Sequence, residues 1–143
     1  GMKFLSKPFA IWFIAIGFYL TSPPLVAETV RWQGYDIHYT TFSSMSIPVD
    51  VAAMHDIARA QNRIVTNVSI LKDGVPQRAE VSGQNTNLLN QLFGMTFTEV
   101  RETTAVYYLS NQLIDERDTL RFEIDISPED LDDTFKLKFM RQY

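Results

Sequence analysis

Two histidines and four of the five methionines are the side chains that could hold a soft metal ion. They are His38, His55, Met45, Met54, Met95 and Met140. Imidazole and thioether groups together suit copper. No spacing among them matches a ligand motif, and a helix would direct the adjacent Met54 and His55 to different sides. Because methionine readily fills core gaps, the sequence favours core methionines and surface histidines. A copper site built from His38, His55, Met45 and Met54 is the alternative.

The acidic segment at residues 127–133 (SPEDLDD) could in principle bind calcium through its carboxylates. Calcium loops alternate oxygen ligands and use a glycine for the tight turn. This segment has no glycine, and Leu131 separates its carboxylates. The pattern therefore predicts an ordinary solvated turn between two strands.

Residues for hydrolytic chemistry are sparse. The sequence has no G-x-S-x-G elbow and no H-E-x-x-H pair, and two histidines leave few bases to activate a serine. Asp115, Glu116 and Asp118 fall in an expected loop, where solvation explains them. We expect no enzymatic activity and no cofactor. A wall- or carbohydrate-cleaving enzyme with carboxylates from different strands is the remaining catalytic alternative.

Amide side chains are concentrated in two segments, NRIVTN and GQNTNLLNQ. Amides both donate and accept hydrogen bonds, so they could line a groove for a peptide or a glycan. They could equally brace loops, because asparagine is frequent at turns. Bracing is the favoured interpretation. If the chain binds a partner, the candidate contacts are Arg63, Asn87, Gln91 and one of Tyr107 or Tyr108. Adjacent strand residues face opposite sides of a sheet, so one of these tyrosines is expected in the core.

The first 27 residues have the pattern of a secretory signal peptide. Lys3 and Lys7 precede an uncharged run at residues 9–20, and Pro23-Pro24 interrupt the chain before the small residue Ala27. The run is short for a membrane span, which needs about 20 apolar residues. We expect cleavage after Ala27 and export to the periplasm or beyond, with no stable membrane anchor. An uncleaved anchor is the alternative. Gly1, before Met2, is interpreted as an expression remnant.

Residues 28–143 are expected to form one domain without covalent staples. The chain has no cysteine, which excludes disulfides, thiolate metal sites and a lipid-carrying cysteine. All 17 acidic residues but only 11 of the 13 basic ones lie beyond Ala27, so this part carries a formal charge of −6. An acidic surface disfavours nucleic acid as a partner.

Seven segments alternate apolar and polar residues with the period of a strand. They are residues 35–40, 64–71, 78–83, 96–101, 105–110, 120–127 and 135–140. The KDG turn (residues 72–74) predicts a hairpin between the second and third segments. The fourth and fifth segments are expected to form another pair, joined by ETT (residues 102–104). Residues 46–61 have helical spacing at Ile47, Val51, Met54 and Ala58, with Ser46 as N-cap. Residues 85–94 (NTNLLNQLFG) predict one or two helical turns. Together these segments predict a mainly antiparallel β-sandwich with a helical insert. A small barrel is the alternative.

Five segments in this order resemble a family of short secreted bacterial proteins, domain of unknown function 4426. They are YDIHYTTF, NRIVTNVSIL, VSGQNTNLLNQ, AVYYLS and LRFEIDISP. Met54 and His55 in the insert depart from the family pattern. The resemblance implies a signal peptide followed by an immunoglobulin-like β-sandwich, and it implies no activity.

The sequence as a whole therefore predicts an exported, non-enzymatic module that binds or assists another component of the bacterial envelope, such as a protein or peptide. A carrier of a small ligand or metal is the second hypothesis. The binding-module hypothesis rests on the absence of a catalytic pattern together with the expected sandwich. A fold alone does not establish function.

Overall fold

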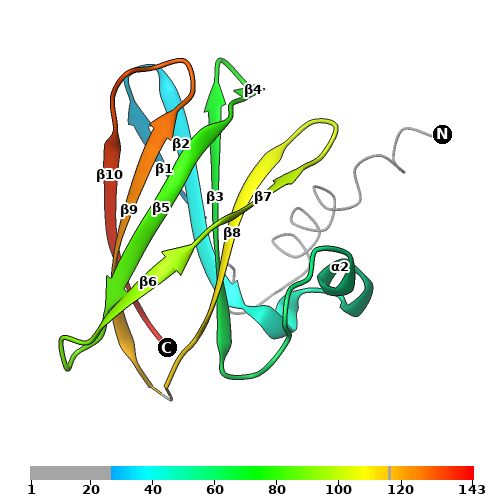
Figure 1. Ribbon diagram of the computed structural model, residues 1–143, viewed down its shortest axis with the longest axis vertical. Coiled ribbons are helices and arrows are strands. Elements are labelled where there is room, and N and C mark those ends of the chain that lie inside the picture. The colour runs from blue at the N-terminus through cyan, green and yellow to red at the C-terminus, as the bar shows by residue number, and fades with distance from the viewer. Residues whose placement is uncertain (1–26, 116) are drawn as a thin grey trace.

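The computed structural model describes residues 27–115 and 117–143, and within them ten strands form two antiparallel sheets (Figure 1). The expected signal peptide lies almost entirely outside the described residues. No helix within the described part is long and apolar enough to cross a membrane.

The first sheet has the strand order β1-β2-β3-β8-β7, with the short β4 pairing to β3. Its strands are β1 (Ala27–Trp32), β2 (Tyr35–Ser43), β3 (Arg63–Lys72), β4 (Val75–Pro76), β7 (Thr98–Arg101) and β8 (Val106–Leu113). The second sheet has the order β10-β9-β5-β6. Its strands are β5 (Ala79–Thr86), β6 (Leu92–Thr96), β9 (Thr119–Pro128) and β10 (Phe135–Gln142). If β2 is strand A, these orders are ABED and GFCC′, the arrangement of immunoglobulin-like sandwiches.

Alternating side chains from both sheets form the main core. From β2 and β3 come Tyr35, Ile37, Val68 and Ile70, and from β9 come Leu120, Phe122, Ile124 and Ile126. Each alternates with residues on the opposite face of its strand, as the sequence pattern predicts. The sandwich and most strand positions are thereby confirmed.

A second, smaller core lies on the face of the first sheet that points away from the second sheet. Val65 on β3 and Leu109 on β8 project to this side, where Ile47 and Ala52 of the insert pack against them. The insert contains a 3-10 helix, η2 (Ser44–Ser46), and the helix α2 (Val49–Met54). Figure 1 shows α2 beside the sandwich rather than within it.

Three local predictions are wrong. β3 makes a hairpin only with the two-residue β4, after which the chain crosses to the second sheet and β5 pairs with β6 and β9. Residues 85–94 form the β5–β6 hairpin instead of helical turns, because strand pairing continues through Thr86 and resumes at Leu92. The helix α2 is only six residues long, so Met54 and Ala58 are exposed instead of lying on an apolar stripe.

Candidate functional site

A cavity of about 610 Å³ opens at one end of the sandwich, the lower end in Figure 1. Its walls come from the end of β2, the start of β3, the β8–β9 connection and Tyr143. The lining residues are Ser43, Gln61, Asn62, Arg63, Ile64, Ile114, Asp115, Arg117 and Tyr143. The volume falls within the range of about 300–1,000 Å³ that is typical of ligand sites.

Backbone hydrogen bonds hold the cavity walls together. The Ile114 N–H donates to the Asn62 carbonyl at 2.8 Å, which ties the β8–β9 connection to the turn before β3. The Tyr143 N–H donates to the Asp118 carbonyl at 2.7 Å. At the other side, the Ser44 hydroxyl both donates to the Ala60 carbonyl and accepts from its N–H, at 2.9 Å each. Segments far apart in the sequence are therefore fixed around one opening.

Arg63, the first residue of β3, is the best positioned charged group of the cavity. Its Nη1 donates to Asn111 Oδ1 at 3.1 Å, and Asn111 Nδ2 donates in turn to the Ala58 carbonyl at 3.1 Å. This chain of bonds orients a half-buried guanidinium, whose other N–H groups make no side-chain bond to residues 27–115 or 117–143. In the described part of the chain, no carboxylate lies within ion-pair distance of Arg63.

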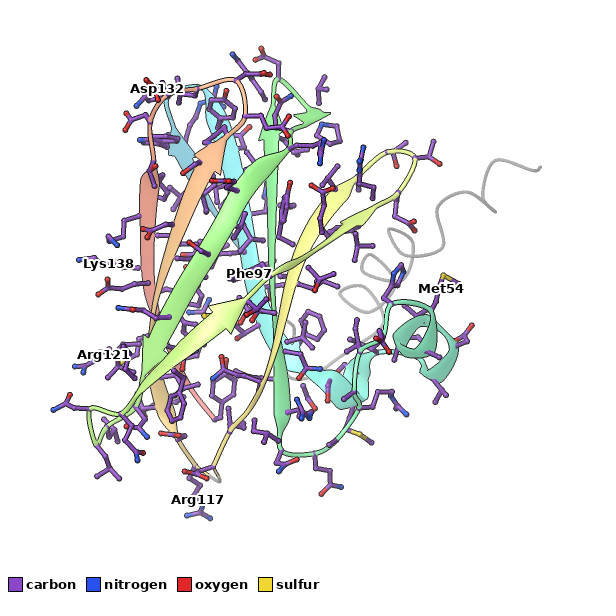
Figure 2. All side chains as sticks on the ribbon, viewed as in Figure 1. Met54, Phe97, Arg117, Arg121, Asp132 and Lys138 are labelled. Carbon is purple, nitrogen blue, oxygen red and sulfur yellow. The ribbon has the colours of Figure 1, made fainter. Side chains whose placement is uncertain are left out.

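Arg117 and Asp115 add opposite charges at the mouth. Arg117 has a left-handed backbone, with φ of 56°, and its side chain lies at the lower tip of the molecule (Figure 2). Ile64 and Ile114 supply an apolar wall. Burial raises the pKa of the Tyr143 phenol above its usual value, so this wall residue is neutral and uncharged at physiological pH. The arrangement offers a fixed cation, two amides and an apolar surface.

Asn87 and Gln91 brace the β5–β6 turn. Asn87 Oδ1 accepts from the Leu89 N–H at 3.0 Å and from the Gln91 N–H at 2.9 Å. Asn87 Nδ2 donates to Gln91 Oε1 at 2.7 Å. These hydrogen bonds within the turn are of the kind that the bracing interpretation expects. Asn87 itself is buried.

Tyr107 and Tyr108 are both buried, so the expectation that one of them lies at the surface is wrong. Tyr107 belongs to the second, smaller core. Tyr108 belongs to the main core, where its hydroxyl donates to Glu99 Oε2 at 2.9 Å and accepts from the Ala79 N–H at 2.8 Å. Two cores, one on each face of β8, account for both positions.

The possible copper ligands are distributed over separate elements. His38 on β2 exchanges a hydrogen bond of 2.7 Å with the Thr29 hydroxyl. His55 follows α2, and Met54 is exposed on that helix, as Figure 2 shows. Met45 lies in η2 and is also exposed. Over residues 27–115 and 117–143 the structure has no group of three or more His, Cys, Asp or Glu side chains placed to hold a metal ion.

The acidic turn after β9 makes structural contacts. Glu129 lies 3.5 Å from Arg78, and Asp133 Oδ2 accepts from Gln33 Nε2 at 2.7 Å. Asp133 Oδ1 accepts from the Thr134 N–H at 2.8 Å. These partners fit the predicted solvated turn.

Most residues that line the cavity had no signal in the sequence. The sequence patterns indicated Arg63 as a candidate contact, and they included Asn62 in an amide-rich segment and Asp115 in an expected loop. No pattern indicated the other lining residues Gln61, Ile114, Arg117 and Tyr143. The β8–β9 connection comes to the start of β3 only because β3 pairs with β8, Arg63 lying opposite Leu113. Correct pairing of these two strands was the one clue that could have located the site.

The strand order defines a class, the immunoglobulin-like β-sandwich, here with a cavity at one end. Within that class the chain belongs to the DUF4426 family, described as a domain of unknown function, whose pattern matches residues 29–143. The crystal structure of a DUF4426 family protein (PA0388) from Pseudomonas aeruginosa PAO1 is similar, with 26% sequence identity and a TM-score of 0.75. The match covers 82% of this chain and 94% of that one. No curated protein matches the sequence.

Proposed function

We propose that this domain is an exported, non-enzymatic binding module of the bacterial envelope, and that it holds a carboxylate-bearing peptide segment in the cavity around Arg63. One observation carries the proposal. Arg63 lines the cavity, Asn111 holds its guanidinium, and no carboxylate in the described part of the chain lies within ion-pair distance of it. A guanidinium held in this way can form a strong charge-assisted bond to an incoming carboxylate.

The remaining walls suit a peptide better than a simple ion. Ile64 and Ile114 offer an apolar surface, and the amides of Gln61 and Asn62 can pair with the backbone groups of a peptide. Arginine is also among the residues that most often dominate binding energy at interfaces.

A binding role is also consistent with the titratable groups present. Among the described lining residues the cavity holds one carboxylate, Asp115, whereas general acid–base catalysis by carboxylates uses two with separated roles. Export is inferred from the leader pattern of the sequence.

The test uses two pools of acetylated tetrapeptide amides that differ at one position, aspartate in one and asparagine in the other. Binding of each pool is followed by two-dimensional NMR of the labelled protein. We expect the aspartate pool alone to shift signals around residues 61–64 and 114–117. Arg63→Gln is expected to weaken this binding at least about tenfold, a loss of about 1.4 kcal/mol.

Arg31→Gln is the matched control. Arg31 is exposed on β1, pairs with Asp36 at 2.9 Å and is not a cavity residue. It should bind the aspartate pool as the wild type does. Equal binding by Arg63→Gln and Arg31→Gln, or no preference for aspartate over asparagine, would overturn the proposal.

A further inference from the structure

One edge of the sandwich lacks the features that normally protect an edge strand. Within the described residues, β6 is the last strand of the second sheet and pairs only with β5. Edge strands usually carry lysine, proline or a bulge that prevents pairing with another chain. β6 (LFGMT) has no charge and no proline, and its register with β5 is regular from Leu92 to Thr96.

The opposite side of the molecule shows the contrast. There Arg141 on β10 forms an ion pair with Glu28 on β1, and the Tyr39 hydroxyl donates to Glu28 Oε2 at 3.0 Å. Lys136 and Lys138 also lie on β10. That side is charged and connected by side chains across the two sheets, whereas β6 itself carries no charged side chain.

Backbone groups of β6 point outward along this edge. The Asn87 N–H donates to the Gln91 carbonyl at 3.2 Å, and the register continues with Asn85 opposite Phe93 and Gly83 opposite Met95. In an antiparallel pair, alternate residues direct their N–H and C=O groups to the partner and away from it. Leu92, Gly94 and Thr96 therefore direct theirs away from β5.

Exposed apolar side chains accompany this free edge. Leu92 is 61% exposed and Phe93 is 43% exposed, and Leu88 and Leu89 at the hairpin tip are more exposed still. Residues 81–98 carry no charged side chain, in a chain whose net charge is negative. A cluster of this kind, on one hairpin, is typical of an interaction surface.

We propose that the partner of this edge is a second copy of the chain, joined by antiparallel pairing of β6 with β6 about a two-fold axis beside Gly94. In that register Gly94 lies opposite Gly94 and Leu92 opposite Thr96. The outward-directed groups of Leu92, Gly94 and Thr96 then meet the same groups of the partner, which satisfies all of them. The two sheets become one continuous sheet.

Side chains and charge agree with self-pairing. Phe93 comes to lie opposite Met95 of the second copy, so that no polar side chain faces its ring across the strands. Two identical strands also bring identical charges together, which is unfavourable at a charged edge but has no cost at β6. Packing within its own chain does not require a glycine at position 94, since a Cβ there would meet no atom within 4 Å. The dimer uses a different face from the cavity and does not depend on the proposed ligand.

Sedimentation equilibrium tests the dimer. The wild type is expected to be dimeric in the micromolar range, and Leu92→Lys/Thr96→Lys is expected to be monomeric at the same concentrations. Both substituted side chains are exposed, so the fold should survive, which circular dichroism checks. Met140→Lys is the control, because Met140 is 56% exposed on the opposite edge strand of the same sheet, and it should leave the dimer intact.

A cysteine cross-link tests the register independently, because the chain has no cysteine of its own. Hydrogen-bonded antiparallel pairs have Cα atoms about 5.5 Å apart, within the range of about 4.4–6.8 Å for disulfides. Gly94→Cys should therefore oxidise to a covalent dimer, and Ser82→Cys, one strand further in, should not. A monomeric wild type, a dimer that survives the two lysines, or equal cross-linking at both positions would overturn the proposal. Pairing of β6 with an added peptide by a monomeric protein would identify a different occupant.

Discussion

Gly83 has no Cβ, and this lets β5 lie close to β9. A Cβ at this position would lie 2.8 Å from the backbone oxygen of Glu123 and 3.1 Å from Cγ1 of Ile124. Neither neighbour can move freely, because both belong to β9 in the centre of the second sheet. Gly83 therefore allows β5 and β9 to approach.

Gly83→Ala is expected to lower the free energy of unfolding by about 1–3 kcal/mol, the usual cost of overpacking. Chemical denaturation measures this difference. Gly94→Ala is the control, since its Cβ would enter open space. At concentrations where the protein is monomeric, it should change stability by no more than about 0.5 kcal/mol. Equal losses from the two substitutions would show that the close approach does not matter.

Tyr107 and Tyr108 make a contribution to the stability of the fold that is lost at high pH. Burial raises the pKa of each phenol to about 12 from 10.0, and the nearby carboxylates, Glu102 for Tyr107 and Glu99 for Tyr108, add to the increase. The native state thus keeps protons that the unfolded chain releases near pH 10. This contribution to stability is complete below pH 10 and is lost as the pH rises through 12.

Tyr108→Phe should reduce that loss, because position 108 then no longer contributes to it. Below pH 10 the substitution should itself cost about 1–3 kcal/mol, since the Ala79 N–H loses its acceptor. Thermal unfolding of the wild type and the variant between pH 8 and pH 12 measures both effects. Parallel stability curves would contradict the raised pKa of Tyr108.

At the scale of elements, the hairpin β5–β6 depends on Asn87. Its side chain makes three hydrogen bonds within the turn and is 3% exposed. Asn87→Ala leaves the N–H groups of Leu89 and Gln91 without their acceptor. We expect a loss of about 1–2 kcal/mol and faster amide exchange at these two residues.

Asn87→Asp distinguishes the acceptor role of the Asn87 side chain from its donor role. The aspartate keeps the oxygen that accepts from Leu89 and Gln91 but loses the bond to Gln91 Oε1. It should therefore protect the two amides more than alanine does. Identical exchange rates in both variants would show that Asn87 does not hold the turn.

Strand positions were predictable from the sequence, and so was the hairpin that β7 forms with β8, whereas the other strand partners were not. The alternation of apolar and polar residues along residues 120–127 predicts a strand with one buried face, and β9 has such a face. The same alternation does not say which sheet a strand joins, so the KDG turn suggested a hairpin that the crossover to β5 replaces. In residues 85–94, local helical preference was overruled by pairing with β5, a tertiary effect. The position of Arg63 in a cavity likewise depends on the β3–β8 pairing.

At the scale of the whole molecule, a reciprocal amide pair connects the two sheets near the cavity end. Asn85 Nδ2 on β5 donates to Gln112 Oε1 on β8 at 2.5 Å, and Gln112 Nε2 donates to Asn85 Oδ1 at 3.0 Å. Asn85 has no exposed surface. Satisfied buried amides of this kind help to fix how two sheets are placed relative to each other.

Asn85→Ala and Gln112→Ala should each cost about 1–3 kcal/mol, because each leaves an amide between the sheets without its partner. The double variant should cost less than the sum, with a coupling of about 0.5–3 kcal/mol in a double-mutant cycle. Additive losses in urea denaturation would mean that the pair does not act as a unit.

The central claim for the whole molecule is that the open end of the sandwich, with Arg63 inside it, is where a carboxylate-bearing peptide binds. A crystal structure of the protein with a bound aspartate tetrapeptide tests this claim most directly. We predict that the peptide carboxylate lies within hydrogen-bond distance of the Arg63 guanidinium, with the apolar part of the peptide against Ile64 and Ile114. A peptide bound elsewhere, with Arg63 still contacting only Asn111, would contradict it.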